Sequence, residues 1–518
     1  MAEAALIPPG WRGRWLQRVA ALLAGASLTA AFAPHDLWWL AVLSPAVLLM
    51  LWRWAPDPRE GAWLGWLFGI GLYASGTWWL YISIRVIGQA PIPVALLVMA
   101  ALVLLMAAYQ AGLGYLVVRW LLPRSVGGVL LTIPAAWVII EWWRGWFLSG
   151  FPWLSLGYSQ TDTWLAGLAP VGGVHLISFV LIMGGGALVT LLCHGSFWRP
   201  LALVALLLPW TAGLALRNVA WTAERGAPLS VAILQGAIPQ ELKWLESNQQ
   251  KILDEYAALH ESALDAKLIV WPESALPDLA NYYSSYLGGV WSSARRHGSS
   301  VLMGVMRAEA RGRGEEPIAF NSLLALDGEE PAFYDKRHLV PFGEYFPVPQ
   351  FVRDWLRLMN LPHLDFVPGR ADQPPMKLAG ETVAVSICYE DAYPQQLRSA
   401  MAQSSLLATV TNDAWFGRSG ARYQHLQIAR MLALESRRYL LRAANDGVSA
   451  IVAPDGQVTG SAPEFKPAVL RGMVQPRTGM TAYLRFGDWP ILGASALIIL
   501  GFTLRLLKNR QSTSIKKH

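Results

Sequence analysis

Three polar residues follow apolar, strand-like runs, and their side chains are of the types that nucleophilic catalysis requires. Glu273 follows Leu-Ile-Val-Trp-Pro, Lys336 lies just beyond an edge-strand pattern, and Cys388 ends an alternating run. A carboxylate in an apolar setting suits a general base, an ammonium suits a developing oxyanion, and a thiol suits a nucleophile. The three residues are therefore candidates for one active site.

Each of these residues also has a plain structural alternative. Glu273 could be a solvent-facing acid in a turn, Lys336 an ordinary surface lysine, and Cys388 an inert thiol that fills the core. The residues that follow Cys388 favour a site, because Tyr389 and Glu390 form a polar cluster that would be poor core filling.

Short β-rich runs alternate with helix-like segments between residues 218 and 487, and this pattern predicts an α/β domain. The helix-like segments cover 240–262 and 422–440. Gly-rich or acidic turns join some neighbouring runs, which suits a layered sandwich whose sheets are not purely parallel. The predicted strands are Ser230–Gln235, Lys267–Trp271, Val301–Val305, Ser322–Leu326, Thr382–Ile387, Leu406–Thr411 and Val448–Val452.

The composition changes sharply near Arg217. The chain is 54% hydrophobic and 15% charged, whereas soluble domains carry roughly a quarter charged residues. Residues 1–217 hold 11 Lys and Arg and 6 Asp and Glu, and the remainder holds 31 and 29. This composition argues against a plain soluble enzyme and a disordered chain. No dense basic run occurs outside the extreme C-terminus, so no nucleic-acid partner is expected.

Eight apolar stretches approach the length of about 20 residues that a transmembrane helix needs. They predict a membrane domain of seven helices over 1–217, and a last helix and tail over 488–518. The predicted spans are 15–33, 38–54, 62–83, 92–118, 127–143, 163–192, 199–216 and 489–507.

Basic residues in the short loops predict the orientation of these spans. Thirteen Lys and Arg fall on one side, whereas the other side holds only Arg85 and Arg144. Both termini are then cytoplasmic, and in a bacterium the 218–487 domain faces the periplasm. Cys193 lies at the cytoplasmic end of its span, so Cys388 is expected to be unpaired.

The order Glu273, Lys336, Cys388 resembles the catalytic triad of the nitrilase superfamily, whose domain is an α-β-β-α sandwich. Together with the eight spans, several further strings resemble the apolipoprotein N-acyltransferase family over nearly the whole chain. These strings are Gly150-Phe151-Pro152-Trp153, Leu234-Gln235-Gly236, Lys243-Trp244, Trp271-Pro272-Glu273-Ser274, His338-Leu339-Val340-Pro341-Phe342-Gly343-Glu344, Cys388-Tyr389-Glu390 and Thr411-Asn412-Asp413-Ala414-Trp415-Phe416-Gly417.

The resemblance implies a two-stage acyl transfer in the bacterial inner membrane. Cys388 would take the sn-1 acyl chain of a phospholipid, typically phosphatidylethanolamine, as a thioester. The N-terminal amine of an S-diacylglyceryl-cysteine apolipoprotein would then receive that chain. Glu273 would act as base, and Lys336 with the backbone N–H after Cys388 would hold the oxyanion.

Further positions follow from the same resemblance. Glu344, Tyr389 and Glu390 would line the pocket, and Glu344 would orient Lys336 or Glu273. Asn321 would support the site from a neighbouring strand. The tryptophans expected at the lipid entrance, or alternatively as interfacial anchors, are Trp153, Trp244 and Trp415.

No cofactor is expected, because His338 and His425 fit no metal-ligand spacing. Aromatic loops at 342–346 and 355–361, together with the turn at 151–153, are expected to bridge the gap between the thiol and the membrane. The first loop is a candidate mobile lid, and the alternative is that these aromatic residues are core packing. Two other functions remain open: a membrane-anchored amidase of the nitrilase superfamily, and a transporter with a sensor domain, for which polar residues within the spans would be required.

Overall fold

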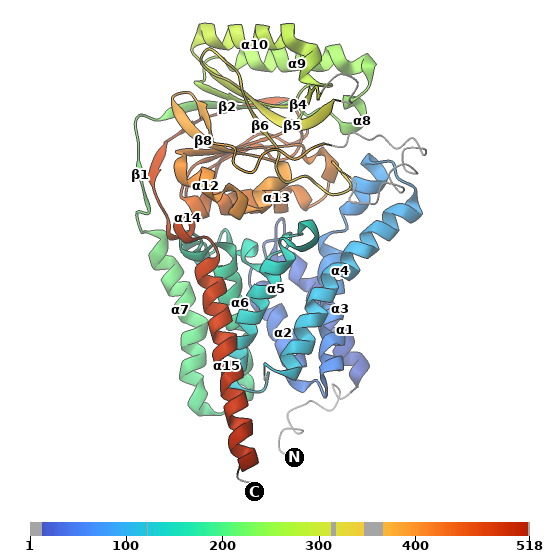
Figure 1. Ribbon diagram of the computed structural model, residues 1–518, viewed down its shortest axis with the longest axis vertical. Coiled ribbons are helices and arrows are strands. Elements are labelled where there is room, and N and C mark those ends of the chain that lie inside the picture. Colours follow the sequence, from blue (N-terminus) through green and yellow to red (C-terminus); the bar gives the residue numbers. More distant parts are fainter. Residues whose placement is uncertain (1–12, 122, 312–316, 346–365, 516–518) are drawn as a thin grey trace. The chain divides into compact units, whose positions relative to one another are not determined.

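The computed structural model describes residues 13–121, 123–311, 317–345 and 366–515. The chain forms two compact units (Figure 1). The first comprises Met1–Val219, Arg418–Gln427 and Phe486–His518, and the second comprises Ala220–Gly417 and Ile428–Arg485. We describe each unit by itself.

The first unit contains a long helix in each of the eight predicted apolar spans. These are α1 (Arg14–Leu28), α2 (Leu40–Trp54), α3 (Pro58–Gly76), α4 (Ile92–Arg119), α5 (Ile133–Arg144), α6 (Ala169–Cys193), α7 (Arg199–Arg217) and α15 (Trp489–Ile515).

Within the described residues, four helical stretches are long and apolar enough to cross a membrane. A membrane domain is therefore supported, whereas the full set of eight spans stays a prediction. The four stretches are Ile92–Arg119, Trp164–Cys193, Ser196–Arg217 and Trp489–Leu506.

Glycines allow α3 to approach its neighbours closely. A Cβ atom on Gly65 of α3 would lie 2.1 Å from the carbonyl oxygen of Gln110 in α4, and one on Gly25 of α1 would lie 1.9 Å from that of Phe68 in α3. Both distances are far inside van der Waals contact. Small residues at helix contacts are typical of packing between transmembrane helices, where backbones meet directly.

The second unit contains two six-stranded sheets. The first sheet has the order β13-β2-β3-β4-β5-β6, in which β2, β3 and β4 are parallel and the other pairs are antiparallel. Its strands are β2 (Leu229–Gln235), β3 (Leu268–Val270), β4 (Ser300–Glu309), β5 (Ile318–Leu326), β6 (Ala332–Asp335) and β13 (Ala468–Val474).

The second sheet has the order β12-β11-β10-β9-β8-β7, and its parallel strands are β8, β9 and β10. Its strands are β7 (Met376–Leu378), β8 (Glu381–Ile387), β9 (Leu406–Thr411), β10 (Leu440–Ala444), β11 (Ala450–Val452) and β12 (Val458–Ser461). A separate pair joins β1 (Thr222–Glu224) to β14 (Arg477–Gly479).

The two sheets pack face to face between two helical layers (Figure 1). Helices α9 (Gln249–Ser262) and α10 (Ser284–His297) cover the first sheet, where Tyr256 stacks on Trp271 at 5.0 Å. Helices α12 (Pro394–Gln403) and α13 (Ala421–Ser436) cover the second sheet. A second apolar cluster joins the inner faces of both sheets. The predicted α-β-β-α sandwich is confirmed.

Two predicted helices differ from those in the structure. The segment 240–262 divides into α8 (Gln240–Lys243), a single turn and α9. The helix predicted over 422–440 ends at Ser436, and after a three-residue turn Leu440 already belongs to β10. All five residues of β10 are buried, and a short buried parallel strand has no alternation that would separate it from the end of a helix.

Candidate active site

The three predicted catalytic residues follow strands that end at the same edge of the sandwich. Cys388 follows β8 directly, Lys336 follows β6 directly, and Glu273 lies three residues beyond β3. The carboxyl ends of parallel strands meet at one edge, and β6 runs in the direction of β4 because β5 is antiparallel to both. The topology therefore brings side chains from distant segments together.

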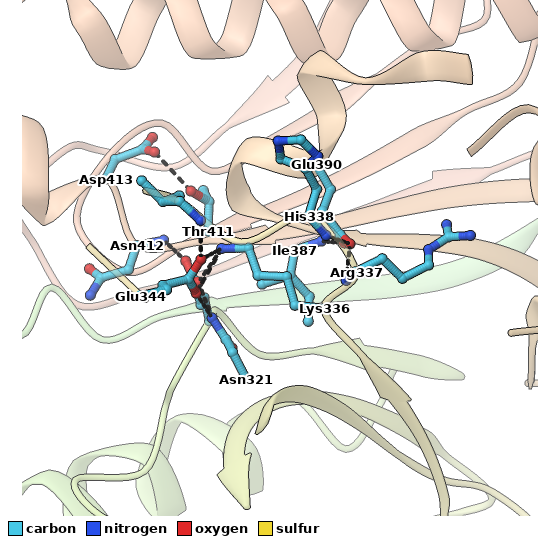
Figure 2. Close-up of polar contacts among 12 residues, drawn as sticks. Asn321, Lys336, Arg337, His338, Glu344, Ile387, Glu390, Thr411, Asn412 and Asp413 are labelled. Atoms are coloured by element: carbon cyan, nitrogen blue, oxygen red, sulfur yellow. Dashed lines mark hydrogen bonds and ion pairs between the residues drawn. The ribbon is translucent and has the colours of Figure 1, made fainter. Parts of the chain in front are cut away.

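Lys336 lies between two carboxylates. Its Nζ is 3.0 Å from Oε1 of Glu344 and 2.9 Å from Oε2, and 3.5 Å from Oε1 of Glu273. The side chain is buried (1% exposed). Burial alone would lower the pKa of the ammonium, but the charges of Glu344 and Glu273 raise it above its usual value. The charged form of Lys336 is therefore favoured, and Glu344 holds its ammonium in place (Figure 2).

Glu273 is fixed by donors from both sheets. The side-chain amide of Asn321, in β5, donates to Oε1 at 2.8 Å, and the backbone N–H of Asn412, after β9, donates to Oε2 at 2.8 Å. Asn321 also donates to Glu344 at 2.7 Å, so it supports both carboxylates from the neighbouring strand. A Cβ atom on Gly304 would lie 2.5 Å from the Cα of Glu273, so only glycine admits this loop against β4.

Cys388 occupies a sharp turn between β8 and a short helical turn. Its φ is +52°, in the left-handed region that few residues other than glycine adopt. Desolvation and the charge of Glu273 raise the pKa of its thiol well above the usual value, and Lys336 and a hydrogen bond from Thr411 partly oppose this. The resting group is therefore a thiol, and attack requires a base.

Glu390 connects the two sheets. It was expected to line the pocket, but its carboxylate is buried and receives the backbone N–H groups of Arg337 at 2.6 Å and Ile387 at 2.8 Å. The hydroxyl of Tyr334 donates to it at 3.1 Å. Burial raises the pKa of Glu390, while these backbone donors lower it. The side chain thereby holds the segment of Arg337, next to Lys336, against that of Ile387, next to Cys388; Figure 2 shows Arg337, Ile387 and Glu390.

The aromatic residues differ in exposure. Trp244 is 44% exposed, whereas Trp415 and Tyr389 are half-buried. Trp153 belongs to the first unit and is buried (1% exposed), with its indole N–H donating to Gln424 at 2.7 Å. The ring of Trp153 is therefore closed off from solvent in this conformation, and its place at a lipid entrance stays a prediction.

Sequence reasoning did not select several residues that the structure places at or behind the site. The sequence predicted no function for Asn412, although this residue lies within the Asn-Asp-Ala-Trp string. Its side-chain amide donates to Gln240 of α8 at 2.7 Å.

Behind the strand ends, Arg442 in β10 pairs with Asp413 at 2.8 Å and with Asp391 at 3.4 Å. A lone arginine within the apolar run Leu-Leu-Arg-Ala-Ala was the available signal.

The candidate lid loop at 342–346 is described up to Tyr345. Residues 346 and 355–361 lie outside the described residues, and Phe342, at the start of the first loop, is 53% exposed. Within the described ranges, no group of three or more His, Cys, Asp or Glu side chains could hold a metal ion.

Two models of known protein families match this chain, one in each of its two parts. Residues 230–483 match the family model described as carbon-nitrogen hydrolase, and residues 24–187 match the apolipoprotein N-acyltransferase N-terminal domain. The first match agrees with the α-β-β-α sandwich, and the two together define an enzyme domain of the nitrilase superfamily.

Curated relatives extend the match to nearly the whole chain. An apolipoprotein N-acyltransferase of Azotobacter vinelandii is 45% identical over 96% of this chain and 95% of its own length. One from Pseudomonas aeruginosa is 42% identical over 95% and 96%. This chain belongs to the apolipoprotein N-acyltransferase family. Among solved structures, a carbon-nitrogen hydrolase from Helicobacter pylori is 18% identical, covers 52% of this chain and 95% of its own, and has a TM-score of 0.37.

Proposed function

We propose that the protein transfers the sn-1 acyl chain of a phospholipid, typically phosphatidylethanolamine, to the N-terminal amine of S-diacylglyceryl-cysteine apolipoproteins. One observation carries the proposal: the buried Glu273–Lys336 pair and Cys388 occur in a chain that also contains helices apolar enough to cross a bilayer. Together they suit an acyl transfer whose substrates are anchored in a bilayer.

In the first stage, Sγ of Cys388 attacks the ester carbonyl while Glu273 accepts the thiol proton. The ammonium of Lys336 and the backbone N–H of Tyr389 hold the oxyanion of the tetrahedral intermediate. The C–O bond then breaks, and Glu273 returns the proton to the departing glycerol oxygen. A lysophospholipid leaves, and the acyl chain remains on Cys388 as a thioester.

In the second stage, the neutral α-amine of the apolipoprotein attacks the thioester carbonyl. The same donors hold the second oxyanion, and Glu273 accepts an amine proton. Collapse of the intermediate breaks the C–S bond, forms the amide and gives that proton to the sulfur. The enzyme returns to its thiol form, so the reaction needs no cofactor.

The test is a reaction with acyl-labelled phospholipid and a synthetic diacylglyceryl-cysteine peptide. The expected product is an N-acylated peptide formed together with an equal amount of lysophospholipid. An amidase or hydrolase with the same triad would instead release labelled free fatty acid whether or not the peptide is present. That result would contradict the proposal.

The roles of base and oxyanion donor predict two loss-of-function variants. Lys336→Met should slow acylation of Cys388 by ~10²-fold or more, since one oxyanion donor contributes about 2.7–4 kcal/mol. Glu273→Gln should slow it by roughly 10²–10⁴-fold, because proton transfer is lost. Lys377→Met, at an exposed lysine of β7, is the control. Release of lysophospholipid at the normal rate by either site variant would contradict its role.

The organisation of the chain completes the proposal. Residues 1–217 would form seven transmembrane helices and 488–518 an eighth helix with a cytoplasmic tail, in the bacterial inner membrane. The catalytic domain, 218–487, would face the periplasm. The test places a single cysteine at exposed Lys251 or at exposed Ser196 in a variant without other cysteines. An impermeant maleimide added on the periplasmic side should label the cysteine at 251 but not the one at 196. The opposite labelling pattern would overturn the orientation.

A further inference from the structure

Lys243 is a buried lysine that the proposed mechanism does not use. It is the last residue of α8 and is 1% exposed. Among the described residues, neither a carboxylate within ion-pair distance nor a hydrogen-bond acceptor partners its ammonium. The ring of Trp244 lies 5.3 Å from Nζ. An aromatic face compensates only part of the cost of burying a charge.

Its position connects it to the base of the site. Gln240, on the same face of α8, accepts the side-chain N–H of Asn412 at 2.7 Å. The backbone N–H of Asn412 in turn donates to Glu273 at 2.8 Å. Consistent with this short path, the charge of Glu273 acts on Lys243. Lys243 therefore lies on the Glu273 side of the site, one helical turn from Gln240.

The charge state of Lys243 suits an anionic ligand. Desolvation lowers the pKa of its ammonium to about 8, although Glu273 and Asp446 oppose the shift. Near pH 7 the group is still mostly protonated, so the site contains a second cation in addition to Lys336. Lys336 has two close carboxylates, but Lys243 has none within 4.0 Å in the described part of the chain. A bound anion would supply the missing partner.

We propose that Lys243 binds the phosphodiester of the phospholipid donor. This inference rests on the proposed function, and it names the group by which the donor is recognised. The phosphodiester lies only a few bonds from the sn-1 ester, so both can occupy one site. The diacylglyceryl-cysteine acceptor carries no phosphate. A compact ammonium is a common phosphate ligand in proteins, and Lys243 would thereby position the donor before acylation.

The test compares two donors with identical acyl chains, phosphatidylethanolamine and uncharged diacylglycerol. Acylation of Cys388 in the full-length enzyme is followed by mass spectrometry over a single turnover. Lys243→Met should slow acylation by the phospholipid about 10- to 100-fold, the effect of a charge-assisted hydrogen bond, and leave acylation by diacylglycerol unchanged. Lys251→Met, at an exposed lysine of α9, should slow neither reaction.

Other outcomes would overturn the inference. Equal slowing with both donors would mean that Lys243 only stabilises the structure around the site. If the methionine variant failed to fold, Lys243→Gln would repeat the test. Normal acylation followed by slow transfer to the peptide amine would assign Lys243 to the acceptor. A Lys243-dependent effect of inorganic phosphate on the diacylglycerol reaction would assign the site to free phosphate. Wild-type enzyme that forms no acyl-Cys388 would contradict the proposed function itself.

Discussion

Cys388→Ala is expected to form no acyl-enzyme and to lose turnover by roughly 10⁴-fold or more, as enzymes do when a catalytic nucleophile is removed. The physical reason is that the mechanism has no other group to receive the acyl chain. Wild-type enzyme incubated with phospholipid alone should carry one acyl group on Cys388, labile to hydroxylamine. Intact-mass and peptide analysis would locate it.

The chain's other cysteine supplies a matched control. Cys193 ends α6 in the first unit, and Cys193→Ala should acylate at the normal rate. Cys388→Ser should be nearly inactive, since a hydroxyl gives up its proton far less readily than a thiol whose pKa is already raised. An acyl group found on Cys193, or retained by the Cys388→Ala variant, would exclude the thioester mechanism.

Arg442→Met is expected to destabilise the second sheet by about 3–5 kcal/mol, the usual effect of breaking a buried ion pair from one side. Arg442 is fully buried and neutralises Asp413 and Asp391, which are buried as well. Both aspartates follow strand ends of the site, so the loops carrying Cys388 and Asn412 should loosen. Hydrogen exchange of the β9 and β10 amides in the full-length protein measures the loss of opening free energy.

An exposed ion pair provides the comparison. Arg471 lies 3.3 Å from Asp265, and both side chains are about half exposed or more. Arg471→Gln should change the opening free energy of the β9 and β10 amides by no more than about 1 kcal/mol. If Arg442→Met left protection of β9 and β10 unchanged, the network would be structurally dispensable, and the loops would have to be held by other contacts.

The sequence predicted the sandwich and selected the candidate catalytic groups because both depend on local patterns. The run before Glu273 is apolar and that before Cys388 alternates, and each ends in a polar side chain, which marks a strand end. The partners of these groups could not be predicted in the same way. Asn321 and Asn412 meet Glu273 from different sheets, and that meeting depends on strand order, which no local pattern contains.

Burial was also difficult to predict for long polar and aromatic side chains. Glu390 was predicted to line the pocket, yet it is satisfied by backbone N–H groups from two segments. Trp153 lies in an aromatic turn of the kind expected at an interface, yet it is closed in by Gln424 from a segment about 270 residues away. Its environment follows from tertiary packing rather than from its own sequence neighbourhood.

The sheet order has a consequence for how the domain acquires its structure during synthesis. Strand β13 pairs with β2 along its whole length, from Ala468 opposite Gln235 to Val474 opposite Leu229. Chains emerge from the ribosome N-terminus first, so β2 stays an open edge until the entire second sheet has been made. Open edges readily pair with other chains. The nascent domain thus carries its proposed base and ammonium before its proposed nucleophile, and its first sheet is complete only when translation has almost finished.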